Sequence, residues 1–338
     1  MKAAMFYRRK EIEIIDIPKP EIGANQVLVR VKSCGICGTD NLIFNGQCYA
    51  KTPLTLGHEY SGDIVEIGKD VKHLRAGDRV VIDPNIFCNK CAFCKIGKAH
   101  LCDNLVSLGV IENGGFAEFS VVPDTNIHKI DPAIDYDEGA LVEPLACCVH
   151  GMERAGLEAG DTVLVTGAGI IGNIMVQLSR LQGAGAVIAV EPIEKRRKIA
   201  RDLGADLLLD PSAQNIKAEI KRMFPAGVDA LIECSGSLEA QEMSQDLVKK
   251  GGTILLFGCS PEDRRLALSP FKINHNEIKV VGSTNNPFTH ARAINLISNG
   301  RIKLKPLISH RMPLEKLAYA FEIFGSEDTT KIVINPNS

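Results

Sequence analysis

The sequence predicts an α/β fold in two parts, a mostly β part followed by a doubly wound parallel sheet. Between Lys2 and Ile82, short alternating apolar runs are separated by proline and glycine, which is typical of strands joined by turns. From Thr162 onward, continuous apolar runs alternate with helical patterns, which is typical of βα units. A length of 338 residues is sufficient for two domains, each with its own core.

Composition narrows the class of protein. A net charge of −2 and a hydrophobic content of 45% indicate a globular chain without the basic surface that nucleic acid requires. The first ten residues lack the apolar core and cleavage site of a signal peptide, and no apolar run reaches the length of a membrane span. We therefore expect a cytoplasmic protein, and we expect its eleven cysteines to be thiols and metal ligands rather than disulfides.

The mostly β part contains a mixed set of metal-binding side chains. Cys37, His58 and Glu59 place a thiol, an imidazole and a carboxylate within about twenty residues, a set typical of zinc sites that keep one position open. Taken singly, the cysteine is more often a buried apolar residue, and the histidine or glutamate a satisfied polar group. Their joint occurrence, in Cys37-Gly38-Thr39-Asp40 and Gly57-His58-Glu59, favours the metal interpretation.

A second cysteine set follows in the same part. Four cysteines spaced as Cys88-x-x-Cys91-x-x-Cys94, followed by Cys102, can close a tetrahedral metal site within a single loop. Because this loop has few apolar residues, its own packing does not offset the entropy lost on ordering, and metal binding supplies the missing free energy. Four independent buried thiols are the alternative, but the loop offers no core to bury them. The predicted structural zinc ligands are Cys88, Cys91, Cys94 and Cys102.

The second part opens with a dinucleotide-binding pattern. The apolar strand 162–166 is followed by Gly167-Ala168-Gly169-Ile170-Ile171-Gly172 and then by helical spacing. The first glycine makes the turn, the second admits the pyrophosphate, the third lets helix and strand pack, and the helix N-terminus stabilises the phosphate charge. A second strand ends at Glu191, nineteen residues beyond Gly172, where a carboxylate meets ribose hydroxyls.

The remaining elements continue the same alternation and then return to irregular structure. The expected helices are 195–203, 216–223, 238–248, 291–299 and a stretch near 314–324, and a strand is expected to resume at 114–119 in the first part. The expected strands of the parallel series are 206–209, 228–233, 253–258 and 278–282, and a closing strand is expected at 331–334.

Together with Val142-Glu143-Pro144-Leu145, these motifs cover the whole chain and resemble the zinc-dependent medium-chain dehydrogenases, especially the polyol (sorbitol-like) and threonine dehydrogenase branch. The resemblance implies a GroES-like catalytic domain at 1–146 and 291–338 around a Rossmann domain at 147–290. It also implies a catalytic zinc held by Cys37 and His58 with a carboxylate, either Glu59 or Glu143. The four-cysteine loop becomes the structural zinc, which gives two zinc sites in each chain.

The resemblance implies further roles. Thr39 matches the hydroxyl that passes the alcohol proton toward solvent, but the histidine that many relatives carry five residues after the zinc cysteine is here Leu42. The proton must leave by another route, through water and the cofactor ribose or through Glu143. The predicted cofactor-binding residues are Gly167, Gly169, Ile171, Gly172, Glu191, Arg196, Thr284 and Asn285.

The cofactor is expected to be NAD, because Glu191 would repel the 2′-phosphate of NADP. Arg196 and Arg197 could instead bind the 2′-phosphate of NADP, but such charge runs usually face solvent. In the polyol branch, the arginine that matches Arg196 lies near the adenine without requiring a phosphate. The edge strand 278–282 is apolar, and relatives pair it across a two-fold axis. We therefore expect a homodimer, or a tetramer built from such dimers.

The predicted reaction is hydride transfer between NAD and a secondary alcohol of a polyol or sugar derivative, with the alcohol oxygen on zinc. A polyol phosphate (galactitol- or arabitol-phosphate-like), a sugar acid and threonine are alternative substrates. A noncatalytic zinc- and nucleotide-binding protein is the alternative from another class, but it would be expected to have lost Cys37, Thr39, His58 or the glycine turn.

Overall fold

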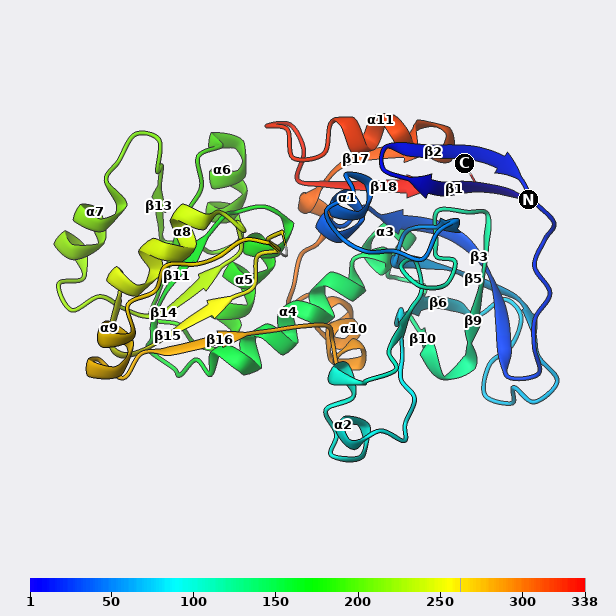
Figure 1. Ribbon diagram of the computed structural model, residues 1–338, viewed down its shortest axis with the longest axis horizontal. Coiled ribbons are helices and arrows are strands. Elements are labelled where there is room, and N and C mark those ends of the chain that lie inside the picture. Colours follow the sequence, from blue (N-terminus) through cyan, green and yellow to red (C-terminus); the bar gives the residue numbers. More distant parts are fainter. Residues whose placement is uncertain (262, 338) are drawn as a thin grey trace. The chain divides into compact units, whose positions relative to one another are not determined.

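The computed structural model describes residues 1–261 and 263–337, so Ser338, the end of the predicted catalytic domain, lies outside the described residues. The chain divides into two compact units, whose elements are labelled in Figure 1. Unit 1 comprises Met1–Ala146, Asn285–Gly300 and Ile308–Ser338, and unit 2 comprises Cys147–Thr284 and Arg301–Leu307.

These bounds differ from the predicted domain limits in two short segments. Residues 285–290 pack with unit 1 rather than unit 2, because the Asn286 amide donates to Glu143 Oε1 at 2.7 Å and accepts from Asn85 Nδ2 at 2.9 Å. Residues 301–307 pack with unit 2, because Lys303 N donates to Gln177 Oε1 at 2.8 Å. Hydrogen bonds between residues far apart in sequence therefore set both limits.

Unit 1 is built on β-sheets. Its larger sheet has the order β10-β6-β5-β3-β18-β17, with β9 also pairing β3, and a smaller sheet has the order β2-β1-β4. Among the described strands of both sheets, β17 and β18 pair in parallel and the other neighbouring strands pair antiparallel. The bounds are β1 Lys2–Arg8, β2 Glu11–Asp16, β3 Gln26–Gly35, β4 Leu54–Thr55, β5 Glu59–Ile67, β6 Arg79–Ile82, β9 Phe119–Pro123, β10 Ile127–Lys129, β17 Ile308–Pro313 and β18 Lys331–Asn335.

The core of unit 1 lies against these sheets, where Tyr60 and Phe116 are fully buried and the rings of Phe44 and Phe321 stack with centroids 4.5 Å apart. The strand expected at 114–119 begins only at Phe119. Gly114 N and Gly115 N instead donate to the carbonyls of Thr55 and Gly57 at 2.7 Å each. Gly114 and Gly115 therefore close over the loop before β5, and the segment joins a sheet only through an isolated bridge between Ala117 and Ala3 of β1.

The remaining elements of unit 1 are short. A two-stranded sheet pairs β7 (Asn85–Ile86) with β8 (Val106–Ser107) beside the cysteine loop. The helices are α1 Gly38–Phe44, α2 Ala92–Lys95, α3 Tyr136–Ala140, α10 His290–Ser298 and α11 Leu317–Glu322, and α4 Val142–Ala155 begins in unit 1 and ends in unit 2. None of the helices among residues 1–261 and 263–337 combines the length and apolar character needed to cross a bilayer.

Unit 2 is a six-stranded, wholly parallel sheet in the order β13-β12-β11-β14-β15-β16. The order reverses beside β11, the strand that precedes the glycine turn, and ligands of open α/β sheets bind at such a switch point. The strands are β11 Thr162–Thr166, β12 Ala186–Val190, β13 Leu207–Leu209, β14 Val228–Glu233, β15 Val248–Leu256 and β16 Lys279–Gly282. The helices are α5 Ile170–Leu181, α6 Glu194–Asp202, α7 Ile216–Met223, α8 Leu238–Met243 and α9 Pro270–His275.

One predicted helix of unit 2 is wrong in its second half. The helix expected at 238–248 ends at Met243, a single 3₁₀ turn follows, and β15 begins at Val248. Val248 pairs with Val228 of β14, and Leu247 and Val248 are both buried. Pairing with the neighbouring strand therefore overrides the local helical pattern.

Candidate functional site

Cys37, His58 and Glu59 lie together in unit 1. One ligand atom from each falls within 4.8 Å of the others, so the three form a group able to hold a metal ion. Cys37 caps the start of α1, His58 precedes β5, and Glu59 is the first residue of β5. Gly57 lets the chain reach this position, because it has φ +91° and a Cβ there would lie 2.8 Å from Cys34 Sγ.

The fully buried Asp40 carboxylate lies between the Cys37 backbone and the His58 ring. Its Oδ2 accepts from Cys37 N at 2.9 Å, and its Oδ1 lies 3.2 Å from His58 Nδ1, within ion-pair distance but not aligned as a hydrogen bond. Burial opposes a charge on His58, but the Asp40 carboxylate and the Cys37 thiol outweigh it and raise the pKa of His58 well above its usual value. Because Nδ1 faces Asp40, Nε2 is the nitrogen available to a metal, and a carboxylate behind a ligand histidine typically fixes its tautomer.

Glu59 has a buried cationic partner. Its Oε2 pairs with the Lys331 ammonium, and the side chain of each is only 2% exposed. Lys331 Nζ also donates to the Ile36 carbonyl at 2.9 Å. Burial opposes the charge of Lys331, but the Glu59 carboxylate, followed by Cys37, raises its pKa. A Cβ on Gly35 would overlap both Glu59 and Lys331, so the pair requires glycine there.

Of the two candidate carboxylate ligands, Glu59 lies with Cys37 and His58, and Glu143 is not among those ligand atoms. Glu143 is buried in the first turn of α4, where its Oε1 accepts from Asn286 Nδ2 at 2.7 Å. Thr39, half-buried in α1, follows Cys37 by two residues.

The four remaining predicted metal ligands also converge. Cys88, Cys91, Cys94 and Cys102 each offer a sulfur within 4.8 Å of the others, and none of these four is in a disulfide. Backbone N–H groups of Cys88 and Asn104 donate to Cys102 Sγ at 3.4 Å. The backbone N–H groups of Lys90 and Cys91 lower the pKa of Cys88 to about 6. Burial, followed by the neighbouring thiols, raises the pKa of Cys94 to about 12. The convergence of four sulfurs is what suits a closed tetrahedral zinc site.

The glycine turn of unit 2 fits a dinucleotide. Gly167 has φ +84°, and a Cβ on Gly172 would overlap the Gly167 carbonyl, so the chain itself requires both glycines. A Cβ on Gly169 would meet nothing within 4 Å, which leaves open space where a pyrophosphate approaches the backbone. The half-buried Ile171 lies in the first turn of α5.

Glu191 lies beside this turn, 3% exposed. Its Oε2 accepts from Ala168 N at 2.8 Å and its Oε1 from Ile193 N at 3.1 Å, so the carboxylate also holds the turn in place. Arg196 Nη1 lies 3.9 Å from Glu191 Oε1. Arg197 donates to the carbonyls of Glu191 and Pro192 and lies 3.0 Å from Asp210, so it supports the fold of unit 2.

The last two predicted cofactor residues fall at a limit between the units. Thr284 is the final residue of the main segment of unit 2, and Asn285 belongs to unit 1. Asn285 has φ +56°, and its Nδ2 donates to the His100 carbonyl at 3.3 Å. Asn285 therefore ties the chain to the cysteine loop, and contact of these two residues with a cofactor stays a prediction.

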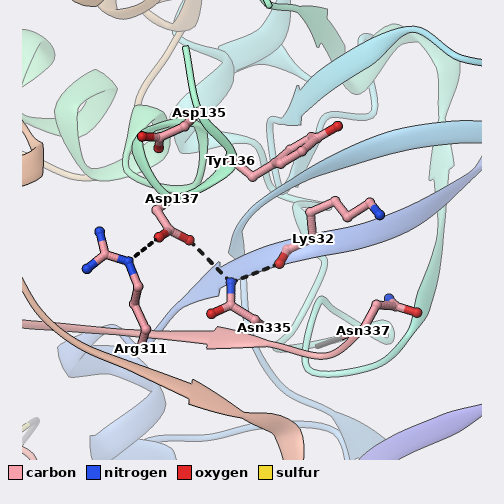
Figure 2. A pocket seen from close by; sticks show the side chains of 7 residues that line it. All are labelled: Lys32, Asp135, Tyr136, Asp137, Arg311, Asn335 and Asn337. Atoms are coloured by element: carbon pink, nitrogen blue, oxygen red, sulfur yellow. Dashed lines mark hydrogen bonds and ion pairs between the residues drawn. The ribbon is translucent and has the colours of Figure 1, made fainter. Parts of the chain in front are cut away.

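Unit 1 also has an open pocket of about 430 Å³, whose lining includes none of the predicted site residues and is drawn in Figure 2. Asp137 is its central group: Oδ2 accepts from Arg311 Nε at 2.6 Å, and Oδ1 accepts from Asn335 Nδ2 at 3.2 Å. These groups pair with one another, and none is a predicted ligand. The pocket is lined by Lys32, Asp135, Tyr136, Asp137, Arg311, Asn335 and Asn337.

Sequence reasoning missed two residues of the candidate site, Asp40 and Lys331. Asp40 is the last residue of the Cys37-Gly38-Thr39-Asp40 motif. Its position three residues after Cys37 is the signal of a carboxylate that caps a helix. Lys331 is 272 residues from Glu59, and no local pattern indicates that contact.

Two family models match the chain. Residues 23–132 match the alcohol dehydrogenase GroES-like domain, and residues 171–299 match the zinc-binding dehydrogenase domain. D-arabinitol dehydrogenase 1 of Uromyces fabae is 34% identical, covering 100% of this chain and 97% of its own. L-threonine 3-dehydrogenase of Symbiobacterium thermophilum is 35% identical over 95% of this chain and 93% of its own length.

Solved structures show the same similarity over the whole chain. A zinc-binding dehydrogenase of Sinorhizobium meliloti 1021, bound to NADP, has a TM-score of 0.95 at 37% identity and covers 99% of both chains. An alcohol dehydrogenase of Escherichia coli CFT073, complexed with NADH, has a TM-score of 0.92 at 30% identity, again with 99% coverage of both.

Proposed function

Because this chain belongs to the zinc-dependent medium-chain dehydrogenases, with a GroES-like and a Rossmann-like domain, we propose that it transfers a hydride between NAD and a secondary alcohol of a polyol or sugar derivative. The observation that carries the proposal is the convergence of Cys37, His58 and Glu59 in one group. The glycine turn, with open space at Gly169, supplies the matching cofactor site in unit 2.

We propose Cys37, His58 and Glu59 as the ligands of the catalytic zinc, with Glu143 outside the resting set. Zinc bound there would act as a Lewis acid toward the alcohol oxygen. Asp40 lies against Nδ1 of His58, so Nε2 is the nitrogen that would bind the zinc. The negative charges of Cys37, Glu59 and Asp40 together balance the divalent ion and the Lys331 ammonium, so the buried site is neutral when the metal is bound.

The alcohol proton requires a separate route. We propose the Thr39 hydroxyl as its first acceptor, since Thr39 lies in the first turn of α1 directly after the Cys37 segment. Leu42, one turn further along α1, carries no proton. The route would therefore continue through water and the cofactor ribose, or through Glu143, rather than along the helix.

The cofactor proposal rests on Glu191. Its buried carboxylate lies beside the glycine turn and would repel a 2′-phosphate in a partly desolvated site. Arg197 interacts with the Glu191 carbonyl and with Asp210. Arg196 is the arginine that lies beside the Glu191 carboxylate, with Nη1 3.9 Å from Oε1. The similar Sinorhizobium protein was solved with NADP and the Escherichia protein with NADH, so cofactor preference needs a direct measurement.

The substrate proposal is a polyol, with a polyol phosphate, a sugar acid and threonine as alternatives, because the similar proteins include both an arabinitol and a threonine dehydrogenase. A zinc site that carries a carboxylate suits a polyhydroxylated substrate. The test is NAD-dependent oxidation of polyols, polyol phosphates, aldonates and L-threonine by the zinc-loaded protein. A higher kcat/KM for threonine than for every polyol would replace the polyol proposal, and no turnover with any alcohol would favour a noncatalytic binding protein.

We further propose that the chain forms a homodimer or a tetramer of dimers through β16. Within residues 1–261 and 263–337 this strand pairs only with β15, and so forms one edge of the sheet in unit 2. An edge strand presents unpaired backbone groups, and a second copy of the same edge satisfies them.

A further inference from the structure

Unit 1 contains a third group of metal-binding side chains, which the proposed dehydrogenase reaction does not use. Asp83 follows β6, His128 lies in β10, and His290 is the first residue of α10. One ligand atom from each lies within 4.8 Å of the others. Three segments separated widely in sequence therefore meet at one point.

The backbone around this group is well fixed. β10 pairs antiparallel with β6, which sets His128 opposite Val81, and Asp83 N donates to the Asn126 carbonyl at 2.9 Å. On the other side, the residue before His290 is anchored because Thr289 Oγ1 donates to the Ala146 carbonyl at 2.8 Å. The three side chains are thus held in place by the fold.

The polar atoms of His290 are poorly satisfied. The residue is 1% exposed, and neither ring nitrogen has a hydrogen-bond partner of good geometry among the residues that the structure describes. Its Nδ1 lies 3.7 Å from Asp83 Oδ2, beyond hydrogen-bonding distance. Its ring stacks on that of His128 with centroids 4.9 Å apart and planes 4° from parallel. Buried imidazole nitrogens without partners are uncommon and call for an explanation such as an ion.

The protonation of the group suits a cation. Burial lowers the pKa of His290 to about 4, against a smaller opposing effect of the Ile82 backbone, and burial followed by the proximity of His290 lowers that of His128 to about 4. Burial raises the pKa of Asp83 to about 6, so the carboxyl group is mostly ionised at neutral pH. Two neutral imidazoles and a carboxylate are the protonation states that metal binding requires.

We propose that Asp83, His128 and His290 bind a divalent first-row transition ion, for which Zn²⁺ is the probe. Two imidazole nitrogens and one carboxylate oxygen are ligands that suit these ions. Ligand atoms around tetrahedral zinc lie ~3.3 Å apart, so side-chain rotations that move these atoms by about an ångström bring the set into bonding range. The ion joins α10, where the chain re-enters unit 1, to the β6 and β10 strands. It is therefore a structural clip, separate from both cysteine-containing groups.

The test counts metal in the full-length protein loaded with Zn²⁺ and freed of loosely bound ion. We expect His290→Asn and His128→Gln each to hold about one equivalent less zinc per chain than the unmodified protein. The matched control is His73→Gln, because His73 also faces a carboxylate, Asp124 at 3.9 Å, but its side chain is 60% exposed. Equal zinc content in folded His128→Gln and unmodified protein would overturn the proposal. Since the result is a difference, it does not depend on the two zinc sites proposed above.

A second measurement covers the case in which His290→Asn does not fold. The unmodified protein is loaded with two equivalents of zinc, which fill the two cysteine-containing sites and leave the third group open, and Co²⁺ is then titrated in. Binding at Asp83, His128 and His290 produces visible d–d bands without the near-ultraviolet charge-transfer band of a thiolate, and His128→Gln lacks them. Absence of such bands in the unmodified protein, or their persistence in His128→Gln, would also overturn the proposal.

Discussion

The ammonium of Lys331 pairs with the carboxylate of Glu59, although the two residues are 272 positions apart. The pair joins β18 to the first residue of β5 and places a positive charge beside the candidate zinc ligands. Neither partner is solvated, so the removal of one leaves an uncompensated charge in the protein interior.

Lys331→Met is therefore expected to lower the free energy of unfolding by about 3–5 kcal/mol, the usual cost of breaking a buried ion pair from one side. Urea unfolding of the zinc-loaded protein measures this. The control is Lys2→Met, because the Lys2–Glu315 pair is about half exposed and is expected to contribute at most ~1 kcal/mol. Equal losses in the two variants would show that the buried pair contributes no more than a surface one.

The same lysine predicts a dependence of stability on pH. Its pKa in the folded protein is raised above the ordinary 10.5, so folding favours the protonated form. The stabilisation is fully present below pH 10.5 and is lost as the pH rises through the folded pKa. The difference in unfolding free energy between unmodified protein and Lys331→Met should thus stay constant below about pH 10 and shrink above it. A difference that instead shrinks on acidification toward pH 6 would contradict this assignment.

The two cysteine-containing groups are expected to respond differently to substitution. Cys37→Ser should abolish turnover and remove one metal equivalent, while the four-cysteine loop stays filled. Cys91→Ser should first reduce stability, because that loop has few apolar residues and depends on its metal. Elemental analysis, thermal unfolding and turnover together distinguish the two. Full activity of Cys37→Ser would show that Cys37 is not a ligand of the catalytic zinc.

Cofactor preference is expected to depend on Glu191. We predict at least a hundredfold preference for NAD over NADP in kcat/KM, about 2.7 kcal/mol. Glu191→Ala should reduce this preference, and part of the loss should come from the turn, since the carboxylate holds Ala168 N. Arg196→Met is the companion variant and should leave the preference for NAD in place. Comparable kcat/KM values in the unmodified enzyme would show that the arginines determine the choice.

Assembly through β16 predicts a dimer or tetramer at micromolar concentration by light scattering. A lysine in place of Val280, which is half-buried on this edge strand, should shift the population toward smaller species. A monomeric unmodified protein would contradict the proposal.

Much of the architecture follows from local pattern. The apolar strands and the glycine turn of unit 2 are adjacent in sequence, so their order predicts a parallel sheet, and helix 216–223 was predicted to the residue. Val248 shows the limit: its surroundings have helical spacing, but its partner Val228 on β14 makes it a strand residue. The four-cysteine set was recognisable because its members lie within fifteen positions of chain. The contacts of Lys331, and the meeting of Asp83 with His128 and His290, depend on tertiary packing that no short pattern records.

The chain order of unit 1 has a consequence for synthesis on the ribosome. β18 lies between β3 and β17 in the larger sheet, yet it is translated after every other described strand of that sheet. Until β18 emerges, β3 lacks one of its neighbours and the Glu59 carboxylate lacks its counter-ion. All of unit 2 precedes β18 in the sequence, so the nucleotide-binding unit is able to fold before the larger sheet of the metal-binding unit is complete.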